Sequence, residues 1–333
     1  MVFLFREVRM PTDSAITYDD IGLFYKKFVE NLQKRIIGLE NIIEHIVISI
    51  LCGNHSLLIG VPGLGKTYLI SSLAELLALK FSRIQFTPDL MPSDIIGTEI
   101  LSFLEENRNF NFLKGPIFAN IILADEINRT PPKTQSALLE AMEEHSVSSF
   151  GQHFKIELPF FVLATQNPIE QEGTYPLPLS QLDRFMFQLN IDYPSIQVER
   201  KIMRQTICNN QHHYSPILTK TTLLHFMDLV RKTKAHNNVI QYAVELCRKT
   251  RPQESEALLF IKENVSWGVG PRATQCLILG AKARALLLGR DTPQISDIQA
   301  ISHAVLRHRI LLSYQAIAEG ISVDHVIDKL LKL

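Results

Sequence analysis

Residues 60–67 of the 333-residue chain read Gly60-Val61-Pro62-Gly63-Leu64-Gly65-Lys66-Thr67. This stretch fits the pattern G-x-x-x-x-G-K-[ST] of a phosphate-binding loop at every position. Its glycines allow backbone N–H groups to converge on an anion, and a helix that begins near Lys66 adds the positive end of its dipole. We expect Lys66 to reach the β- and γ-phosphates of ATP and the Thr67 hydroxyl to bind Mg²⁺. The stretch therefore predicts a nucleotide site, since it also follows an expected strand and opens an expected helix.

The segments around this loop predict the fold. Short apolar runs bounded by turn residues are typical of buried parallel strands, and longer runs with helical spacing are typical of helices. The expected strands are 56–59, 83–86, 120–124, 160–165 and 184–189, and helices are expected at 68–79 and 133–144. Strands that alternate with helices indicate an α/β fold, here a parallel five-stranded sheet with helices on both faces.

Other segments depart from this alternation. Apolar runs joined by polar or glycine-containing turns predict hairpin insertions at about 97–114 and 145–158. Apolar residues recur at helical spacing from 19 to 51, with a break at Gly38, and beyond Pro194 only helical patterns occur. We therefore expect a tail over 1–18, an α/β nucleotide-binding domain over 19–195 and an all-helical lid over 196–333.

Charge divides the chain into unlike halves although its formal net charge is zero. Residues 1–197 hold 15 Lys and Arg against 23 Asp and Glu, a net charge of −8, and residues 198–333 hold 19 against 11, a net charge of +8. We expect the basic half to meet either an acidic partner or the acidic half of another copy. No apolar run reaches the roughly 18 residues of a membrane span, and the first residues lack a signal-peptide pattern, so we expect a cytoplasmic protein.

A pair of acidic residues ends one of the expected strands. The apolar residues 121–124 lead directly into Asp125-Glu126. The carboxyl ends of parallel strands face the ligand crevice, where we expect Asp125 to hold Mg²⁺ through water and Glu126 to polarise the attacking water as a general base. Taken alone, the two carboxylates would suit the solvated start of a helix equally well. Beside a complete phosphate-binding loop, they predict hydrolysis of the nucleotide.

Together these motifs make the chain resemble the MoxR family of AAA+ ATPases, from about residue 20 to the end. Ile37-Gly38-Leu39-Glu40 resembles the segment that contacts the nucleotide base in that family. The other stretches that carry the resemblance are 85–97, 114–120, 125–129, 164–168, 179–185, 270–273 and 305–309. The resemblance implies an AAA+ P-loop NTPase domain followed by a helical lid.

The resemblance also implies roles for single residues. Asn167 would orient the water that attacks ATP. Arg184 would be an arginine finger that reaches the γ-phosphate held by a neighbouring subunit, with a salt bridge to Asp183 as the alternative. Arg272, at the start of a lid helix, would be a second sensor on the nucleotide of its own subunit, and Arg129 belongs to the acidic motif without an assigned role. The expected nucleotide contacts are Ile37, Gly38, Gly60, Pro62, Gly63, Leu64, Gly65, Lys66, Thr67 and Tyr68.

An arginine finger requires an oligomer, and the resemblance implies a homo-oligomer, commonly a head-to-tail hexameric ring. MoxR relatives are thought to act as chaperones that remodel or mature protein complexes, often with a partner that bears a von Willebrand A domain. The hairpin insertions contain Phe103, Phe110, Phe112 and Phe150, which would contact a protein client or pack on their own domain. The expected function is therefore Mg²⁺-dependent ATP hydrolysis in a ring that remodels a protein client.

Three other functions share parts of this pattern. A phosphotransferase would use the same loop but would not need Asn167, Arg184 and Arg272 in this order. A DNA-directed AAA+ ATPase, such as a clamp loader or transcription activator, would suit the basic half. However, the chain has neither the activators' characteristic loop nor a helix-turn-helix, so we do not expect a nucleic-acid partner. A metal-chelatase-type AAA+ subunit is related by fold and needs no metal ligands of its own.

Overall fold

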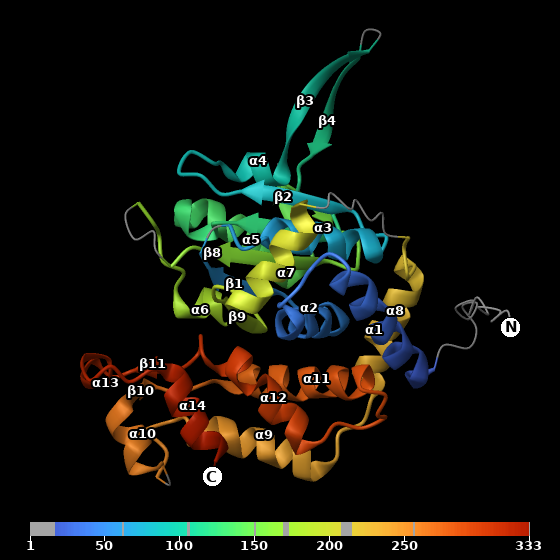
Figure 1. Cartoon of the computed structure of the whole chain (residues 1–333). Coiled ribbons are helices and arrows are strands. Elements are labelled where there is room, and N and C mark those ends of the chain that lie inside the picture. The colour runs from blue at the N-terminus through green and yellow to red at the C-terminus, as the bar shows by residue number, and fades with distance from the viewer. Residues whose placement is uncertain are drawn as a thin grey trace, which may run out of the picture.

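The computed structural model of the chain describes residues 17–61, 63–104, 107–149, 151–168, 173–207, 215–255 and 257–332, with the backbone alone at 19, 101–104, 107–110 and 205–207. Figure 1 shows a sheet domain from which a long hairpin projects, and a lid of helices packed beneath it. The predicted tail lies almost wholly outside the described residues, and helix α1 (Tyr18–Gln33) begins at its last position.

Five strands form the central sheet: β1 (Ser56–Gly60), β2 (Phe81–Gln85), β5 (Ile121–Asp125), β8 (Phe161–Gln166) and β9 (Phe187–Ile191). Their order is β2-β5-β8-β1-β9, and every pairing is parallel. The predicted five-stranded parallel sheet is therefore confirmed. The last strand begins at Phe187 rather than at residue 184, because the Arg184 and Phe185 amides continue the turn that follows the short helix α6 (Leu179–Leu182).

Helices cover both faces of this sheet, as predicted, because its inner strands are apolar on both sides. Leu123 and Leu163 point into one core, and their neighbours Ile122 and Val162 point into the other. The helices of this domain are α1, α2 (Glu40–Cys52), α3 (Lys66–Leu76), α4 (Pro92–Ile96), the 3₁₀ turn η1 (Ile127–Arg129), α5 (Pro132–Glu144) and α6, and α7 (Ile196–Ile207) leads towards the lid. The core that contains α1, α2 and α3 continues into the lid.

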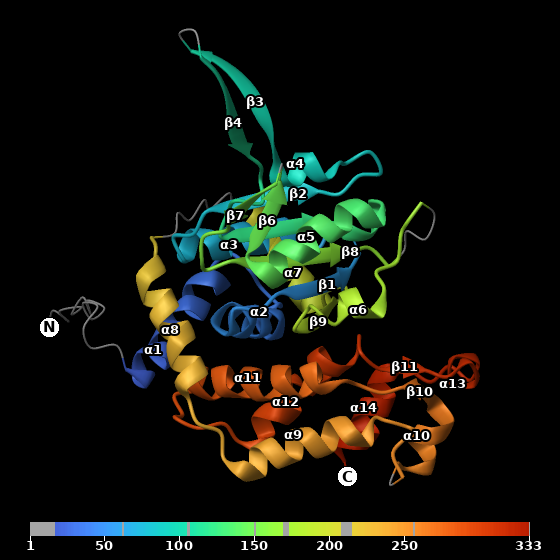
Figure 2. The same ribbon diagram turned by 180° about the vertical axis from the view of Figure 1, so that it is seen from behind.

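Both predicted insertions are antiparallel hairpins. They are β3 (Gly97–Leu104) with β4 (Asn107–Lys114), which projects from the body in Figures 1 and 2, and β6 (Ser146–Ser149) with β7 (Gln152–Lys155). Phe112 and Phe154 stack with ring centroids 4.0 Å apart, which joins the two hairpins. Phe112 therefore packs on its own domain, whereas Phe150 and the side chains of Phe103 and Phe110 lie outside the described residues.

The lid is helical, as predicted, apart from one short antiparallel pair of strands. Its elements are α8 (Lys220–Lys232), α9 (Asn237–Lys249), α10 (Leu259–Asn264), β10 (Val265–Trp267), α11 (Pro271–Leu287), α12 (Ile295–Leu306), β11 (Leu311–Leu312), α13 (Tyr314–Ala318) and α14 (Val323–Leu331). Helix α11 packs against α1 and α2, so the lid and the sheet domain share buried apolar residues. Within the described ranges, no helix is long and apolar enough to cross a membrane.

The parallel strands give the sheet two different edges. All five strands end at the carboxyl edge and begin at the amino edge, about 16 Å away for a five-residue strand. The buried His55 lies at the amino edge, directly before β1. Its Nε2 donates to the Met142 carbonyl at 3.0 Å, and its Nδ1 accepts from the Val162 N–H at 3.1 Å. His55 thus fastens the end of α5 to the amino edge.

Protonation of His55 is expected to destabilise the fold at acid pH. Burial lowers the pKa of His55 from 6.5 to about 4. Between these values the unfolded chain binds a proton that the folded chain does not, so stability falls as the pH falls through this window, by about 3 kcal/mol in all. The variant His55→Gln keeps a donor and an acceptor but does not titrate. Urea unfolding at pH 7 and pH 4 should therefore show a smaller loss of stability for the variant than for the wild type, and equal losses would contradict this account.

Candidate active site

The phosphate-binding loop connects the end of β1 to the start of α3, as predicted. Gly63 has φ of +87° and Gly65 has φ of +73°, both in the left-handed region that disfavours residues with a side chain. Gly65 is the N-cap of α3, so the unpaired amides of the first helical turn lie at the loop. This is the arrangement in which a helix N-terminus binds a phosphate. Pro62 lies outside the described residues.

A cleft of about 460 Å³ lies at the carboxyl edge beside this loop. Its lining comprises Gly63, Gly65, Lys66, Thr67, Tyr68, Arg83, Gln85, Asp125, Glu126 and Asn167. Asn167 directly follows β8 and is buried. The fold therefore brings the phosphate-binding loop, both acidic residues and Asn167 to one place, although they come from distant parts of the sequence.

Lys66 lies among oxygen atoms and negative charges. Its ammonium donates a hydrogen bond to the Gly60 carbonyl. Burial lowers the pKa of Lys66, whereas the nearby carboxylates of Asp125 and Glu126 act in the opposite direction. A nucleotide phosphate beside the ammonium would also favour its charged form. Lys66 is therefore placed to serve as a cation for phosphate.

Thr165 ties the two acidic residues together. Its hydroxyl donates to Asp125 Oδ1 at 2.6 Å and accepts from the Glu126 N–H at 2.9 Å. Arg83 donates to the other Asp125 oxygen at 2.6 Å. Glu126 has φ of +58°, a left-handed conformation that costs a non-glycine residue about 1–3 kcal/mol and recurs at functional sites. The hydrogen bonds of Thr165 help to hold this conformation.

The Glu126 carboxylate has partners from two elements. Gln85 Nε2 donates to Oε2 at 3.0 Å, and Arg129 Nη1 donates to the same oxygen at 3.1 Å. The sequence alone assigns no role to Arg83, Gln85 or Thr165. The sequence does contain a signal for Arg83 and Gln85, because they are polar residues at alternate positions of a strand and therefore share one face. For Thr165, only the pairing of β8 with β5 reveals its position.

The donor set in the cleft fits Mg²⁺. This ion prefers hard oxygen ligands and keeps several waters, and the Thr67 hydroxyl and Asp125 carboxylate line the same cleft. Each Asp125 oxygen accepts one hydrogen bond and has further acceptor capacity for a water molecule. In the part of the chain that the structure describes, no group of three His, Cys, Asp or Glu residues could hold a metal. The ion would thus depend on water and phosphate oxygens for most of its ligands.

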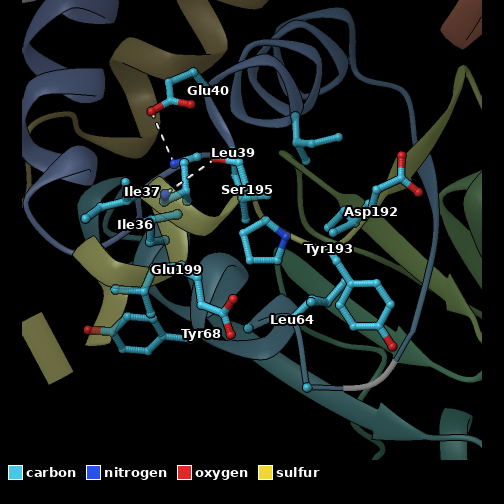
Figure 3. A pocket seen from close by; sticks show the side chains of 18 of the residues that line it. Ile36, Ile37, Leu39, Glu40, Leu64, Tyr68, Asp192, Tyr193, Ser195 and Glu199 are labelled. Atoms are coloured by element: carbon cyan, nitrogen blue, oxygen red, sulfur yellow. Dashed lines mark hydrogen bonds between the residues drawn. The ribbon is translucent and has the colours of Figure 1, made fainter. Parts of the chain in front are cut away.

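A larger cavity of about 770 Å³ adjoins the cleft (Figure 3). Its lining includes Ile36, Ile37, Gly38, Leu39, Leu64, Tyr68, Tyr193, Val198 and Met203. Tyr68 and two glycines of the loop line both spaces, so the cavity and the cleft meet at the phosphate-binding loop. The predicted base contacts Ile37 and Gly38 lie in this wall, where the Gly38 N–H donates to Glu40 at 3.3 Å. A mostly apolar cavity beside a phosphate site suits a nucleotide base.

The two predicted arginines lie at the other edge of the sheet. Arg184 precedes β9, next to the point where the Met186 N–H donates to the His55 carbonyl at 2.8 Å. Arg184 and Arg272 are both absent from the linings of the cleft and the cavity. Their guanidinium groups share the carboxylate of Glu143, near the end of α5: Arg184 contacts Oε2, and Arg272 donates to Oε1 at 3.1 Å.

These positions refine two expectations from the sequence. Arg272 was expected at the nucleotide of its own subunit, but α11 begins beside Glu143 at the amino edge and so carries Arg272 to Arg184 instead. The alternative partner for Arg184, Asp183, forms its salt bridge with Arg309 of the lid at 2.6 Å. Nothing in the sequence indicates a role for Glu143, because it contacts both arginines only once the lid packs on the sheet domain.

Known proteins resemble this chain in sequence. A family model described as ATPase family associated with various cellular activities (AAA) matches residues 55–187, and a model of the AAA lid domain matches residues 259–330. The chain is 41% identical to Chaperone MoxR1 of Mycobacterium tuberculosis over 308 residues, which cover 92% of this chain and 81% of that protein. It is 29% identical to Protein MoxR of Paracoccus denitrificans, over 84% of this chain and 86% of that protein.

A solved structure is also similar. The crystal structure of a putative ATPase from Cytophaga hutchinsonii superimposes with a TM-score of 0.87 at 40% sequence identity, and the match covers 94% of this chain and 96% of that one. The sequence identity, the share of each chain that is matched and the order of the sheet and lid domains all indicate the same family. The chain therefore belongs to the MoxR family of AAA+ ATPases.

Proposed function

We propose that this protein hydrolyses ATP with Mg²⁺ in the cleft at the carboxyl edge, and that it does so in a ring of identical subunits. Hydrolysis is supported by the presence of Glu126 and Asn167 beside the phosphate-binding loop. Binding alone would need only the loop, whereas a carboxylate and an amide at this point can take a proton from water and orient it. Bound Mg²⁺ would supply neutralisation of the charge on the phosphate oxygens.

Several residues of the cleft have separate tasks in this proposal. Lys66 and the loop amides bind the β- and γ-phosphates, while Thr67 and Asp125 would hold the metal. Glu126 accepts the proton of the attacking water. Gln85 and Arg129, which both donate to Glu126 Oε2, orient that carboxylate. The base occupies the adjoining cavity, against Ile37, Gly38, Leu64 and Tyr68.

The position of Arg184 and Arg272 is the observation that most directly supports a ring of subunits. Both contact Glu143 at the amino edge and line neither the cleft nor the cavity of their own chain. The two edges are a strand length of about 16 Å apart, whereas a charge-assisted contact to a phosphate oxygen spans about 3 Å. An amino edge that faces the carboxyl edge of the next subunit would bring both arginines to the neighbour's ATP. Such a head-to-tail contact forms a closed ring when the rotation between subunits permits it. In this proposal Arg272, like Arg184, acts on the neighbour's nucleotide.

Charge and family resemblance add to this picture. The net charges of −8 and +8 on the two halves of the chain favour contact between the sheet domain of one subunit and the lid of the next. A relative named as a chaperone supports a protein client for the ring, which we infer to be hexameric. The resemblance to MoxR proteins adds a partner with a von Willebrand A domain to the proposal.

Removal of the metal is expected to abolish the activity. The purified protein should release phosphate from ATP in the presence of Mg²⁺, and excess EDTA should reduce the rate to that of Lys66→Ala, which loses the phosphate-binding ammonium. Added Mg²⁺ should restore the rate. Undiminished phosphate release in EDTA, or a wild-type rate no higher than that of Lys66→Ala, would contradict the proposed function.

A further inference from the structure

The lid forms several hydrogen bonds to the segment of backbone that contains Arg184. Arg309 lies just after α12, within the stretch 305–309 that carried part of the family resemblance but received no role. Only 3% of its side chain is exposed, and a buried arginine requires partners for its charge. Those partners lie mainly in the turn of residues 183–186, which connects α6 to β9.

Four hydrogen bonds of Arg309 cross from the lid to this turn. Nε donates to Asp183 Oδ1 at 2.6 Å. Nη2 donates to the Asp183 and Phe185 carbonyls at 3.1 and 2.7 Å, and Nη1 donates to the Met186 carbonyl at 3.1 Å. One planar guanidinium therefore holds three carbonyls and a carboxylate on both sides of Arg184.

His308 adds a further hydrogen bond from the lid to this turn. Its Nε2 donates to the Phe185 carbonyl at 3.1 Å. Burial, together with the charge of Arg309, holds the pKa of His308 well below its usual value, so the neutral ring can keep its one N–H on this nitrogen. Two consecutive lid residues thus bind the backbone of the turn.

The side chain of Arg184 is connected to the lid as well. Glu143 contacts Arg184 through one carboxylate oxygen and Arg272, at the start of α11, through the other. The Glu143 carboxylate also offsets the repulsion between two guanidinium groups that lie close together. The lid therefore contacts both the backbone around Arg184 and the carboxylate that binds its side chain.

Only the last residue of the turn is fixed from the β1 side, through the hydrogen bond from the Met186 N–H to the His55 carbonyl at 2.8 Å. The Arg184 and Phe185 amides donate to the Gln181 and Leu182 carbonyls of α6 at 3.2 and 3.0 Å. The carbonyls of Asp183, Phe185 and Met186 accept hydrogen bonds from the lid. Loss of Arg309 would remove the lid donors of the Asp183 and Met186 carbonyls and leave the Phe185 carbonyl with His308 alone, and the backbone would move to satisfy them. An arginine that acts in another subunit tolerates little movement, since a displacement of about 1 Å can cost about 100-fold in rate.

We propose that Arg309 is a positioning residue for Arg184, through which the lid of one subunit controls ATP hydrolysis in the next. The inference rests on the shared site proposed above. Arg309 touches neither the cleft nor the cavity of its own chain. A movement of the lid would therefore change hydrolysis in the neighbouring subunit before it changed nucleotide binding in its own.

The variant Arg309→Lys tests this role, because lysine keeps the charge but lacks the planar fork of donors. Uniform rings of Arg309→Lys should hydrolyse ATP about 10- to 100-fold more slowly than the wild type, while a fluorescent ATP analogue binds with unchanged affinity. The matched control is Arg290→Lys. Arg290 pairs with the buried Asp297 at 2.6 Å inside the lid and does not contact the turn, so its variant should keep the wild-type rate.

Mixed rings separate positioning from a general loss of structure. Lys66→Ala subunits cannot bind ATP but still offer Arg184, so their addition should restore hydrolysis at the intact nucleotide sites of Arg309→Lys. Addition of Arg184→Ala should restore nothing, because both variants then lack a functional arginine. Uniform Arg309→Lys rings as active as Arg290→Lys rings would overturn the proposal.

A reference mixture shows which proposal has failed. If Lys66→Ala with Arg184→Ala recovers activity but Lys66→Ala with Arg309→Lys does not, the positioning role is wrong and the shared site stands. If neither mixture recovers, the shared site itself is wrong. Should Arg309→Lys not fold, Asp183→Asn carries the test, since it removes only the charge at one contact of Arg309. Asp183→Asn should also hydrolyse ATP more slowly than the wild type at unchanged affinity, and Lys66→Ala but not Arg184→Ala should restore its activity. Wild-type activity of Asp183→Asn would overturn the proposal.

Discussion

Replacement of Arg184 by alanine is expected to lower the rate of ATP hydrolysis about 10³- to 10⁵-fold, without weakening ATP binding to the variant's own cleft. The guanidinium neutralises charge that develops on the γ-phosphate in the transition state. Arg184 lies at the amino edge and outside the cleft, so the nucleotide site of its own chain should remain intact. The defect should thus appear in turnover and not in affinity.

Steady-state phosphate release and equilibrium binding of a labelled ATP analogue measure the two effects separately. Arg200→Ala is a suitable control, since Arg200 is an exposed arginine at the surface of α7 and should tolerate the change. An Arg184→Ala protein that hydrolyses ATP at the wild-type rate would contradict the assignment. So would a wild-type protein that remains monomeric with ATP and Mg²⁺ and still turns over.

Replacement of Glu126 by glutamine should lower hydrolysis about 10²- to 10⁴-fold while ATP stays bound. The amide has nearly the same shape as the carboxylate but cannot accept a proton from water. The hydrogen bond from Thr165 to Asp125 does not involve the changed group, so the metal ligand should keep its position.

Single-turnover measurements test this prediction, because they follow cleavage of pre-bound ATP without the contribution of product release. Glu144→Gln is the matched control: Glu144 is an exposed residue at the end of α5 and lines neither the cleft nor the cavity. Rapid loss of ATP from Glu126→Gln, or hydrolysis within about threefold of the wild-type rate, would contradict a role as general base. A stable ATP-bound state would also allow the variant to retain its client for identification.

The sheet could be predicted from the sequence because the local residue patterns there agree with the overall fold. Apolar runs such as 121–124 lie in strands that are buried on both faces, and the spacing of Gly60, Lys66 and Thr67 requires a strand, a tight loop and a helix in that order. The carboxyl edge then gathers Asp125 and Asn167 by topology alone. These positions follow from the sequence without knowledge of the lid.

The amino edge could not be predicted in the same way. The contact between Arg184 and Glu143 joins residues that are far apart in sequence. The contacts of Glu143 with Arg272 and of Arg309 with the turn form only when the lid packs on the sheet domain. The turn also mimics a strand, because Phe185 is buried in a core of the sheet domain and Met186 in the core shared with the lid. This burial explains why the sequence pattern started the last strand three residues too early.

A site shared between subunits is the central claim, and a mixture of two inactive variants tests it most directly. Lys66→Ala keeps Arg184 but cannot bind ATP, and Arg184→Ala binds ATP but lacks the arginine. In a random equal mixture, about a quarter of the head-to-tail interfaces combine an intact nucleotide site with an intact arginine. We predict that phosphate release by the mixture rises to about a quarter of the wild-type rate. A rate no higher than the average of the two separate variants would contradict the claim.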